Sequence, residues 1–295
     1  MIAGPGAGTS AREGDVPPMI AALDNGKSAA YCARIGLAAL PAADAEGLAL
    51  MQRAHRLAIP FENLDIMLGR GIDLAPDSVF AKLVTARRGG YCFEQNQLFL
   101  RALLAAGFTA RPLLARVWLI PTDTTPPRTH SFNLVELGGR PWIADAGFGG
   151  AFTPPMPLND GAEASSPDGA RHRLSARAIG GESAWMLERH DGNGWADQYS
   201  FTLAPVVPAD LEMANHWTAT APASRFTRLH IASRVTETGF LSLTDRSFTE
   251  RANGRIVDQV EAGDAAGWSR LLADRFGIAL DPTAVAGLGL FALSR

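Results

Sequence analysis

Apolar and polar positions change their period near residue 108 of this 295-residue chain. Before that point apolar side chains recur at spacings of three and four, the pattern of amphipathic helices. The segments with this pattern are residues 27–36, 44–57, 76–86 and 92–107. Beyond it, short runs of strand-forming residues alternate with Gly and Pro turns, which predicts a β-barrel or sandwich. The strand-like runs are residues 111–120, 130–137, 140–146, 171–176, 183–189 and 198–203.

The two ends of the chain follow other patterns. Residues 1–25 are rich in Gly, Ala and Pro, which predicts a disordered extension. From residue 208 onward helical and strand-like patterns are mixed. The elements expected there are a short helix, strands at residues 227–235, 239–244 and 255–260, and a helix at residues 264–276. We therefore expect an α+β protein with more than one domain.

The segment RRGGYCFEQN, residues 87–96, places Cys92 behind a pair of glycines and in the first turn of a predicted helix. At a helix N-terminus, the unpaired backbone N–H groups and the positive end of the helix dipole favour a thiolate over a thiol. Arg87 and Arg88 add positive charge to this segment. Cys92 is therefore a candidate nucleophile. The second cysteine, Cys32, lies in an apolar run and is interpreted as a packing residue.

A nucleophilic cysteine needs a base and a group that orients the base, and one predicted hairpin supplies both. Gly138 and Gly139 separate two strand-like runs, and a two-residue glycine loop favours a tight primed turn. With that loop, Phe132 faces Asp145 across the hairpin, and His130 shares a face with Phe132. The imidazole is then a diagonal neighbour of the carboxylate. A loop longer or shorter by one residue would place the two on opposite faces.

The remaining histidines are better explained as packing or surface residues. They are His55 in a predicted helix, His172 and His190 beside strand-like runs, and His216 and His230 among aromatic residues. Without His130, Asp145 would be interpreted as a satisfied polar residue near a strand end. The candidate site therefore depends on the hairpin geometry.

Five separated segments of the chain resemble the arylamine N-acetyltransferase family. They are YCARIGL at 31–37, IPFENLD at 59–65, RRGGYCFEQN at 87–96, DAGFGG at 145–150, and NHW at 215–217 followed by Thr220, Pro222, Ser224 and Phe226. Agreement at five places, from about residue 31 onward, is much more specific than one motif. The resemblance implies a helical domain at 26–107, a β-barrel domain at 108–207 and an α/β lid at 208–295. It also implies a papain-like catalytic triad of Cys92, His130 and Asp145 where the domains meet.

The resemblance implies acetyl transfer in two steps. The Cys92 thiolate attacks the thioester of acetyl-coenzyme A, releases the coenzyme A thiol and holds the acetyl group until an amine collects it. His130 holds the Cys92 proton and later removes one from the amine, while Asp145 fixes the imidazole tautomer. Backbone N–H groups at the helix start are candidates for the oxyanion site. The acceptors implied are arylamines, arylhydrazines or N-hydroxyarylamines.

The resemblance also suggests a pocket for the acceptor. Phe61 and Phe148 match family residues that line an aromatic pocket, and Val117 or Trp118 on the preceding strand is expected to close it. Large aromatic side chains dominate ordinary cores as well as ligand pockets. Core packing is therefore the alternative interpretation of these positions.

Four further positions are assigned by the same resemblance. Glu62 and Arg88 match a buried ion pair that braces the nucleophile segment, and loss of one partner would leave an unpaired charge. Thr220 matches a position near the coenzyme, although Ala221 replaces the small hydroxyl residue that often follows it. Gly149 belongs to a short glycine-rich run that is expected to approach phosphate. That run lacks the strand-to-helix context of a nucleotide fingerprint, and such runs are often plain turns.

Composition changes this interpretation little. A net charge of -3 and an apolar content of 47% suit an enzyme in solution, and no basic cluster indicates a nucleic-acid partner. We expect no membrane span, because no run of about 18 apolar residues occurs, and no secretory signal. With two cysteines, a disulfide framework is not expected, and a working thiolate suits the cytoplasm. We expect no metal, and the sequence leaves a homodimer open.

Other functions remain open from the sequence. A papain-like cysteine hydrolase or a transglutaminase would use the same three residues, because a triad does not define the acceptor. An amide synthase of the same family, which closes an antibiotic macrocycle, is another alternative. A non-catalytic binding protein is the last one, and it would require a Cys92 that does not react with alkylating reagents.

Overall fold

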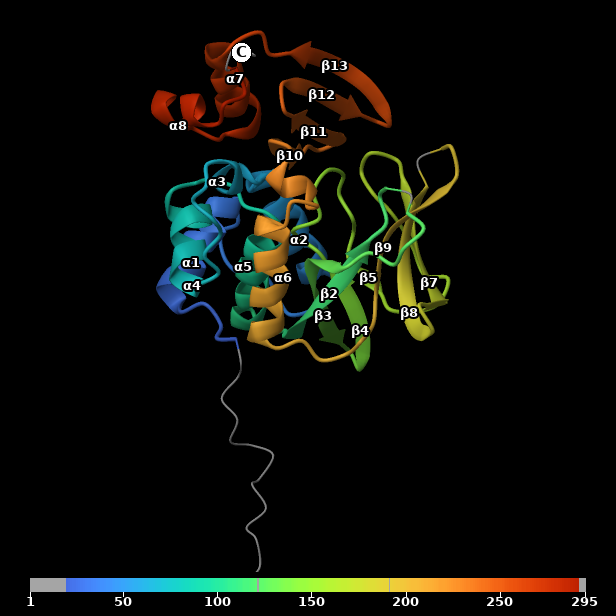
Figure 1. The fold of residues 1–295 in the computed structure, drawn as a ribbon. Helices are drawn as coiled ribbons and strands as arrows, with labels where there is room; N and C mark the ends of the chain where they lie inside the picture. Colours follow the sequence, from blue (N-terminus) through green and yellow to red (C-terminus); the bar gives the residue numbers. More distant parts are fainter. Residues whose placement is uncertain (1–19, 121, 191, 292–295) are drawn as a thin grey trace, which may run out of the picture.

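The computed structural model describes residues 20–120, 122–190 and 192–291, and Figure 1 shows its helices and two sheets. Residues 1–19 of the predicted extension lie outside the described part. The described chain joins the fold before residue 26, because Leu23 is buried and the Asp24 carboxylate caps the first helix. None of the helices within the described ranges is long and apolar enough to cross a membrane.

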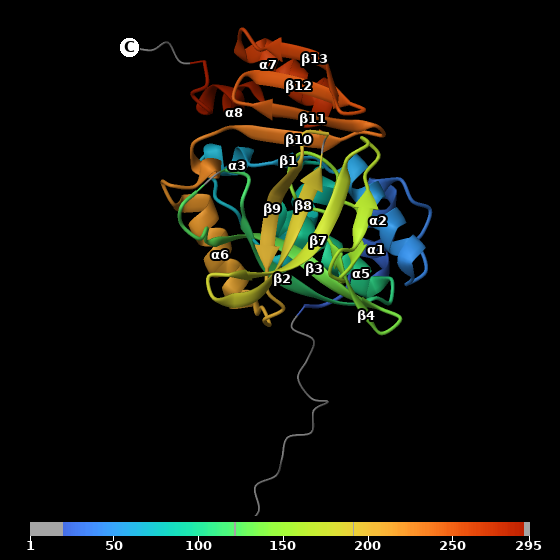
Figure 2. The same ribbon diagram turned by 90° about the vertical axis from the view of Figure 1, so that its right-hand side faces the viewer.

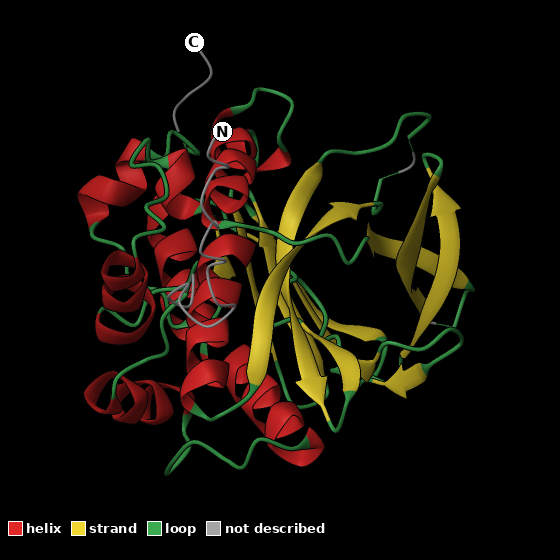
Figure 3. Ribbon diagram, turned by 90° about the horizontal axis from the view of Figure 1, so that it is seen from below, coloured by secondary structure: helices red, strands yellow, loops and turns green. Residues whose placement is uncertain are grey.

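The helices expected before residue 108 are present and lie on one side of the molecule (Figure 3). They are α1 (Asn25–Ile35), α2 (Ala45–Ala58), α4 (Pro76–Phe80) with the π-helical turn η1 (Ala81–Thr85), and α5 (Cys92–Ala105). Asp24 and Asp44 cap the first two, and Gly36 ends α1 in the left-handed conformation. Between α2 and α4 the chain forms two short elements, β1 (Phe61–Glu62) and α3 (Leu64–Met67).

The strands that follow form one antiparallel eight-stranded sheet that curls into a barrel-like shape (Figure 2). Its order is β5-β4-β3-β2-β9-β8-β7-β6. The strands are β2 (Thr109–Val117), β3 (Arg128–Leu137), β4 (Arg140–Ala144), β5 (Met156–Pro157), β6 (Glu163–Ser165), β7 (Arg171–Ile179), β8 (Glu182–His190) and β9 (Trp195–Phe201). Its inner face has an apolar core, while Val135 and Ala144 pack into the core of the helices. The helical region and the sheet therefore share a core.

The predicted register of the β3–β4 hairpin is confirmed. Val135 pairs with Trp142 and Leu137 with Arg140, so the two glycines form the whole loop. Gly138 and Gly139 have φ angles of 57° and 74°, the left-handed values that a primed turn requires. The turn therefore fixes which side chains of the hairpin share a face.

The last part of the chain lies against the rest as a separate layer (Figure 1). After α6 (Pro208–Thr220) and the 3-10 turn η2 (Arg225–Thr227), a second sheet has the order β1-β10-β11-β12-β13. Its strands are β10 (Ile231–Val235), β11 (Gly239–Thr244), β12 (Ser247–Ala252) and β13 (Arg255–Glu261), and its helices are α7 (Ala265–Leu271), η3 (Leu272–Phe276) and α8 (Pro282–Gly287). Because β1 is the edge strand of this sheet, residues 61–62 connect the layer to the helical region.

Candidate active site

Cys92 is the first residue of α5, and its side chain lies where the helices, the barrel-like sheet and the last layer meet. Its core neighbours include Phe61 of β1, Leu114 of β2 and Ile231 of β10. The residue is 3% exposed, and its sulfur lies 3.8 Å from the Thr129 carbonyl oxygen. The predicted position of Cys92 in the first helical turn is confirmed.

The predicted contact between His130 and Asp145 is also confirmed. His130 Nε2 lies 2.7 Å from Asp145 Oδ2, and both side chains are almost completely buried. The Cys92 sulfur is close enough to the imidazole to raise its pKa. Because Nε2 is engaged by the carboxylate, Nδ1 is the nitrogen that remains for the sulfur. The structure thus brings the three predicted residues together in the order Cys92, His130, Asp145.

The electrostatics of this set favour a charged imidazole. Burial lowers the pKa of His130, but the Asp145 carboxylate and the Cys92 sulfur outweigh burial and raise that pKa to about 10. Burial likewise raises the pKa of Asp145, while His130, Asn96 and the Gly147 N–H lower it, and the lowering prevails. An imidazolium beside a thiol stabilises the thiolate, so the arrangement suits nucleophilic catalysis.

Two residues that hold Asp145 were not identified from the sequence. Asn96 Nδ2 donates to Asp145 Oδ1 at 3.0 Å, and Asn96 Oδ1 accepts the Ala146 N–H at 2.9 Å. Gln52 Oε1 accepts the Asp145 N–H at 2.9 Å. Asn96 lies one helical turn after Cys92, within the segment RRGGYCFEQN. The sequence alone therefore placed it on the same face of the predicted helix as Cys92. Gln52 comes from α2, and no local pattern relates it to Asp145.

The glycine-rich run after Asp145 packs against the start of α5. A Cβ atom at Gly147 would lie 2.9 Å from Cys92 Cα and 2.5 Å from Asn96 Nδ2. Only glycine permits so close an approach without a shift of backbone. At Gly149 a Cβ would lie 3.2 Å from the Phe61 ring, a tight contact that a small ring movement would relieve. Gly147 therefore sets the distance between the carboxylate segment and the nucleophile.

A cavity of about 380 Å³ opens beside Cys92 and His130. Phe61, Val117, Phe148 and Gly149, all selected from the sequence, line it. The Phe148 ring also packs edge-on against His130, with 5.0 Å between the ring centroids. The cavity thus combines an apolar wall with the reactive groups. No group of His, Cys, Asp and Glu side chains in the described part of the chain is arranged to hold a metal ion.

Two residues selected from the sequence as contacts of the acceptor or the coenzyme lie outside this lining. The Trp118 indole donates to Ser200 Oγ at 2.8 Å, whereas its neighbour Val117 lines the cavity. Thr220 is exposed at the end of α6, where its hydroxyl donates to the His216 carbonyl oxygen at 2.6 Å. Thr218 on the same helix lines the cavity instead. The coenzyme contact of Thr220 stays a prediction.

The Glu62 and Arg88 side chains form the ion pair that the resemblance implied. Arg88 Nε and Nη2 donate to the two Glu62 oxygens at 2.8 and 3.0 Å, and Glu62 is fully buried. The pair belongs to a larger charge network, since Lys82 Nζ lies 2.8 Å from both Asp65 Oδ2 and Glu94 Oε1. Glu94 also accepts the Tyr91 N–H at 3.1 Å. The network therefore clamps the backbone immediately before Cys92.

Comparisons with known proteins define the family of this chain. A family model described as N-acetyltransferase matches residues 44–285. The arylamine N-acetyltransferase of Escherichia coli (strain K12) is 39% identical over 253 residues, which cover 85% of this chain and 88% of that protein. The solved arylamine N-acetyltransferase of Salmonella typhimurium superimposes with a TM-score of 0.83 at 36% identity, over 89% of this chain and 97% of the other.

A further solved structure is the Mycobacterium marinum arylamine N-acetyltransferase in complex with CoA. It has a TM-score of 0.81 and 30% identity, and the alignment covers 88% of this chain and 98% of the other. The matching family model defines the class of this protein as N-acetyltransferase. Within that class, the chain belongs to the arylamine N-acetyltransferase family, whose members are acyltransferases.

Proposed function

We propose that this protein transfers an acetyl group from acetyl-coenzyme A to arylamines, arylhydrazines or N-hydroxyarylamines by a ping-pong mechanism through an acetylated Cys92. The observation that carries the proposal is the buried Cys92–His130–Asp145 set, with 2.7 Å between His130 Nε2 and Asp145 Oδ2, at the wall of a cavity. The complex of the Mycobacterium marinum relative with CoA supports the choice of donor.

In the first half-reaction, the Cys92 thiolate attacks the carbonyl carbon of the thioester. The tetrahedral oxyanion is stabilised by first-turn N–H groups of α5, which have no acceptor within the helix. When the intermediate collapses, the bond to the coenzyme A sulfur breaks and the His130 imidazolium protonates that sulfur. Cys92 then carries the acetyl group as a new thioester.

In the second half-reaction, the nitrogen of the acceptor attacks the acetyl-Cys92 carbonyl. His130, now neutral, removes a proton from this nitrogen, and Cys92 leaves as a thiolate beside the regenerated imidazolium. Asp145 holds the imidazole so that Nδ1 faces the sulfur in both steps. Phe61, Val117 and Phe148 offer an apolar wall that suits a flat aromatic acceptor.

The test is the intact mass of the protein after brief mixing with acetyl-coenzyme A without an acceptor. We expect a gain of one acetyl group in the native chain and none in Cys92→Ala, with loss of the adduct on addition of an aromatic amine. Cys32→Ala is the matched control, because Cys32 is the second cysteine and is buried in α1. It should still form the adduct.

Two results would contradict the proposal. An adduct that persists in Cys92→Ala would assign the nucleophile elsewhere. A native chain that remains unmodified while it hydrolyses the thioester rapidly would identify a cysteine hydrolase in place of a transferase, because a transferase must protect its acyl-cysteine from water.

A further inference from the structure

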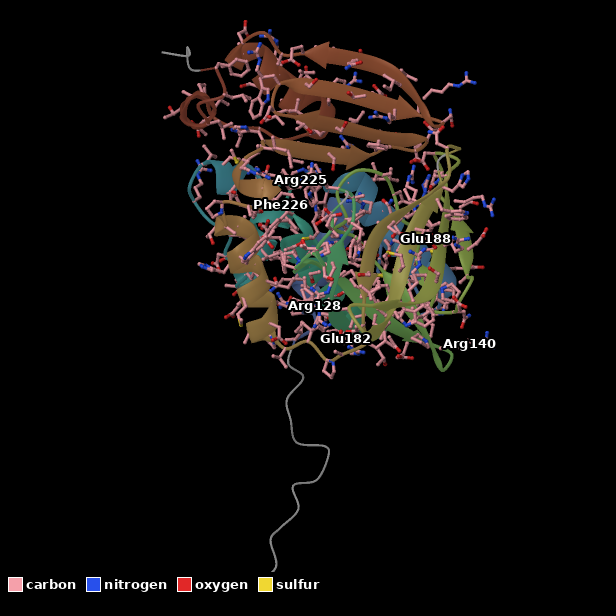
Figure 4. The ribbon with its side chains drawn as sticks, turned by 45° about the vertical axis from the view of Figure 1, so that its right-hand side comes forward. Arg128, Arg140, Glu182, Glu188, Arg225 and Phe226 are labelled. Atoms are coloured by element: carbon pink, nitrogen blue, oxygen red, sulfur yellow. The ribbon has the colours of Figure 1, made fainter. Side chains whose placement is uncertain are left out.

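Arg225 is a half-buried cation without an acceptor in the described part of the chain. It begins η2, between α6 and β10, and lines the same cavity as Cys92. Its Nε atom is buried and has no hydrogen-bond partner among the described residues. Burial lowers the pKa of Arg225, and no carboxylate among the described residues lies close enough to raise it again. Figure 4 shows Arg225 beside Phe226, on the segment below the last sheet.

Other shielded arginines of this protein have partners. Arg88 and Arg189 form ion pairs with carboxylates. Arg34 and Arg56 donate hydrogen bonds to backbone carbonyl oxygens. The described contact of the Arg225 guanidinium is with the face of an aromatic ring, 5.9 Å from Cζ to the ring centroid. Since a shielded charge without a hydrogen-bonded partner is costly, the lack of an acceptor for Arg225 at the cavity indicates a group that is available to a ligand.

The charges of the residues around the cavity also favour an anionic ligand. The described residues that line it include Arg225 and Arg228 but neither an aspartate nor a glutamate. Arg228 is exposed, and its Nη2 donates to the Ala223 carbonyl oxygen at 3.5 Å. Arg225 is therefore the more shielded of the two cations and the one without such an acceptor. A guanidinium presents a planar fork of donors that matches the oxygens of phosphates and carboxylates.

We propose that Arg225 is a specificity-determining residue that binds an oxyanion of a substrate while the reacting carbonyl lies at Cys92. Two substrates of the proposed reaction can supply that oxyanion, namely the phosphates of coenzyme A and the carboxylate of an acidic acceptor. The proposal rests on the proposed function for the identity of these substrates, and the experiment separates them.

The experiment compares Arg225→Gln with the native chain in two arms. The first arm uses acetyl-coenzyme A or the phosphate-free acetyl thioester of N-acetylcysteamine, each with the neutral acceptor 4-methylaniline. The second arm uses the phosphate-free thioester with 4-aminobenzoate or 4-methylaniline. A charge-assisted hydrogen bond is worth about tenfold to a hundredfold in affinity, so a loss of that size in kcat/KM is expected for one anionic substrate.

The pattern of loss identifies the anion. A loss with acetyl-coenzyme A alone assigns the site to phosphate, and a loss with 4-aminobenzoate alone assigns it to the acceptor carboxylate. Arg225→Lys should restore part of the loss in the same arm, because it keeps the charge without the fork. Arg140→Gln removes an equally charged but exposed side chain at the β3–β4 turn, far from Arg225 in Figure 4, and should match the native chain.

Equal loss with all substrates, the neutral pair included, would overturn the proposal, because it would indicate a structural role. Unchanged kinetics in both arms would overturn it as well. Direct binding of coenzyme A and of 4-aminobenzoate to Cys92→Ala and to Cys92→Ala/Arg225→Gln separates this inference from the proposed function. Binding of either ligand that depends on Arg225 would support the anion site even if Cys92 never becomes acetylated.

Discussion

The two walls of the cavity differ in how their polar groups are satisfied. On the wall formed by α5 and the β3–β4 hairpin, His130, Asp145 and Asn96 form a continuous hydrogen-bonded set in a buried environment. On the wall formed by α6, η2 and β10, Arg225 Nε has no partner among the described residues and Trp217 is 39% exposed. The polar side chains of the first wall are already held in place by one another, as a catalytic site requires. On the second wall, Arg225 has a hydrogen-bond donor that a ligand can occupy.

The largest expected effect falls on the satisfied wall. In Asp145→Asn the amide can keep its contacts with Asn96 and Gly147, but it no longer holds His130 as an imidazolium in one tautomer. We expect kcat/KM for acetyl transfer to fall by about a thousandfold or more, and the Tm at neutral pH to fall as well, because Asp145 is the main group that raises the pKa of His130 in the folded state. Asp274→Asn changes an exposed aspartate as a control. A loss of less than tenfold would show that the carboxylate does not orient the imidazole.

A substitution that pushes the Asp145 segment away from Cys92 should have the second-largest effect on activity. Gly147→Ala places a Cβ against Cys92 Cα and should lower kcat by about tenfold to a hundredfold, because a small misplacement of reacting groups is costly. Gly149→Ala is the matched control, since it meets only the movable ring of Phe61. Steady-state kinetics of both variants check this. Equal losses of kcat in the two variants would show that the close contact between Gly147 and Cys92 is not specifically required.

The buried charge network that includes Glu62 and Arg88 lies next to the Cys92 segment and should affect the free energy of unfolding. Glu62→Gln removes one partner of a buried pair, and Asp65, 3.4 Å from Arg88, compensates for part of the loss. We expect the free energy of unfolding in urea to fall by about 3 kcal/mol, at the low end for a broken buried pair. Glu163→Gln breaks the exposed pair with Arg171 and should cost below about 1 kcal/mol. A similar loss of unfolding free energy in Glu62→Gln and Glu163→Gln would show that burial does not strengthen the effect of breaking an ion pair.

The protonation of His130 gives a prediction for pH. Because folding raises the pKa of this imidazole to about 10, from about 6.5 in the unfolded chain, the folded state binds the proton more tightly. This contribution to stability is complete below pH 6.5 and is lost as the pH rises through about 10. The free energy of unfolding should fall across that window more steeply in the native chain than in His130→Gln. Parallel curves would contradict the raised pKa.

The smallest effect is expected at the end of α6. In Thr220→Val the only change is loss of a hydroxyl that bonds within its own helix, so the KM for acetyl-coenzyme A should change by less than about twofold. The measurement is the acetyl-coenzyme A dependence of the transfer rate. An increase of tenfold would show that Thr220 contacts the coenzyme, as the resemblance implies, and that the helix end moves on binding.

Predictions that depend on local geometry were the most reliable. Turn length and the alternation of side chains were sufficient to place His130 beside Asp145, because both are properties of one hairpin. Strand β12, SFTERA, was missed because its sequence is largely polar and short. It forms by pairing with β11 and β13, and its single large apolar residue, Phe248, enters the core of the last layer.

The sequence by itself determined the two local parts of the candidate set, since the helix start at Cys92 and the β3–β4 hairpin are each defined over fewer than 20 residues. Only the tertiary structure decided which distant groups support that set and which face the cavity. Gln52 reaches Asp145 from α2, and Arg225 reaches the Cys92 cavity from a turn more than 130 residues later. The physical reason is that hydrogen-bonding turns and strand alternation act between neighbours in the chain. Burial and the absence of a partner are properties of the packed molecule as a whole.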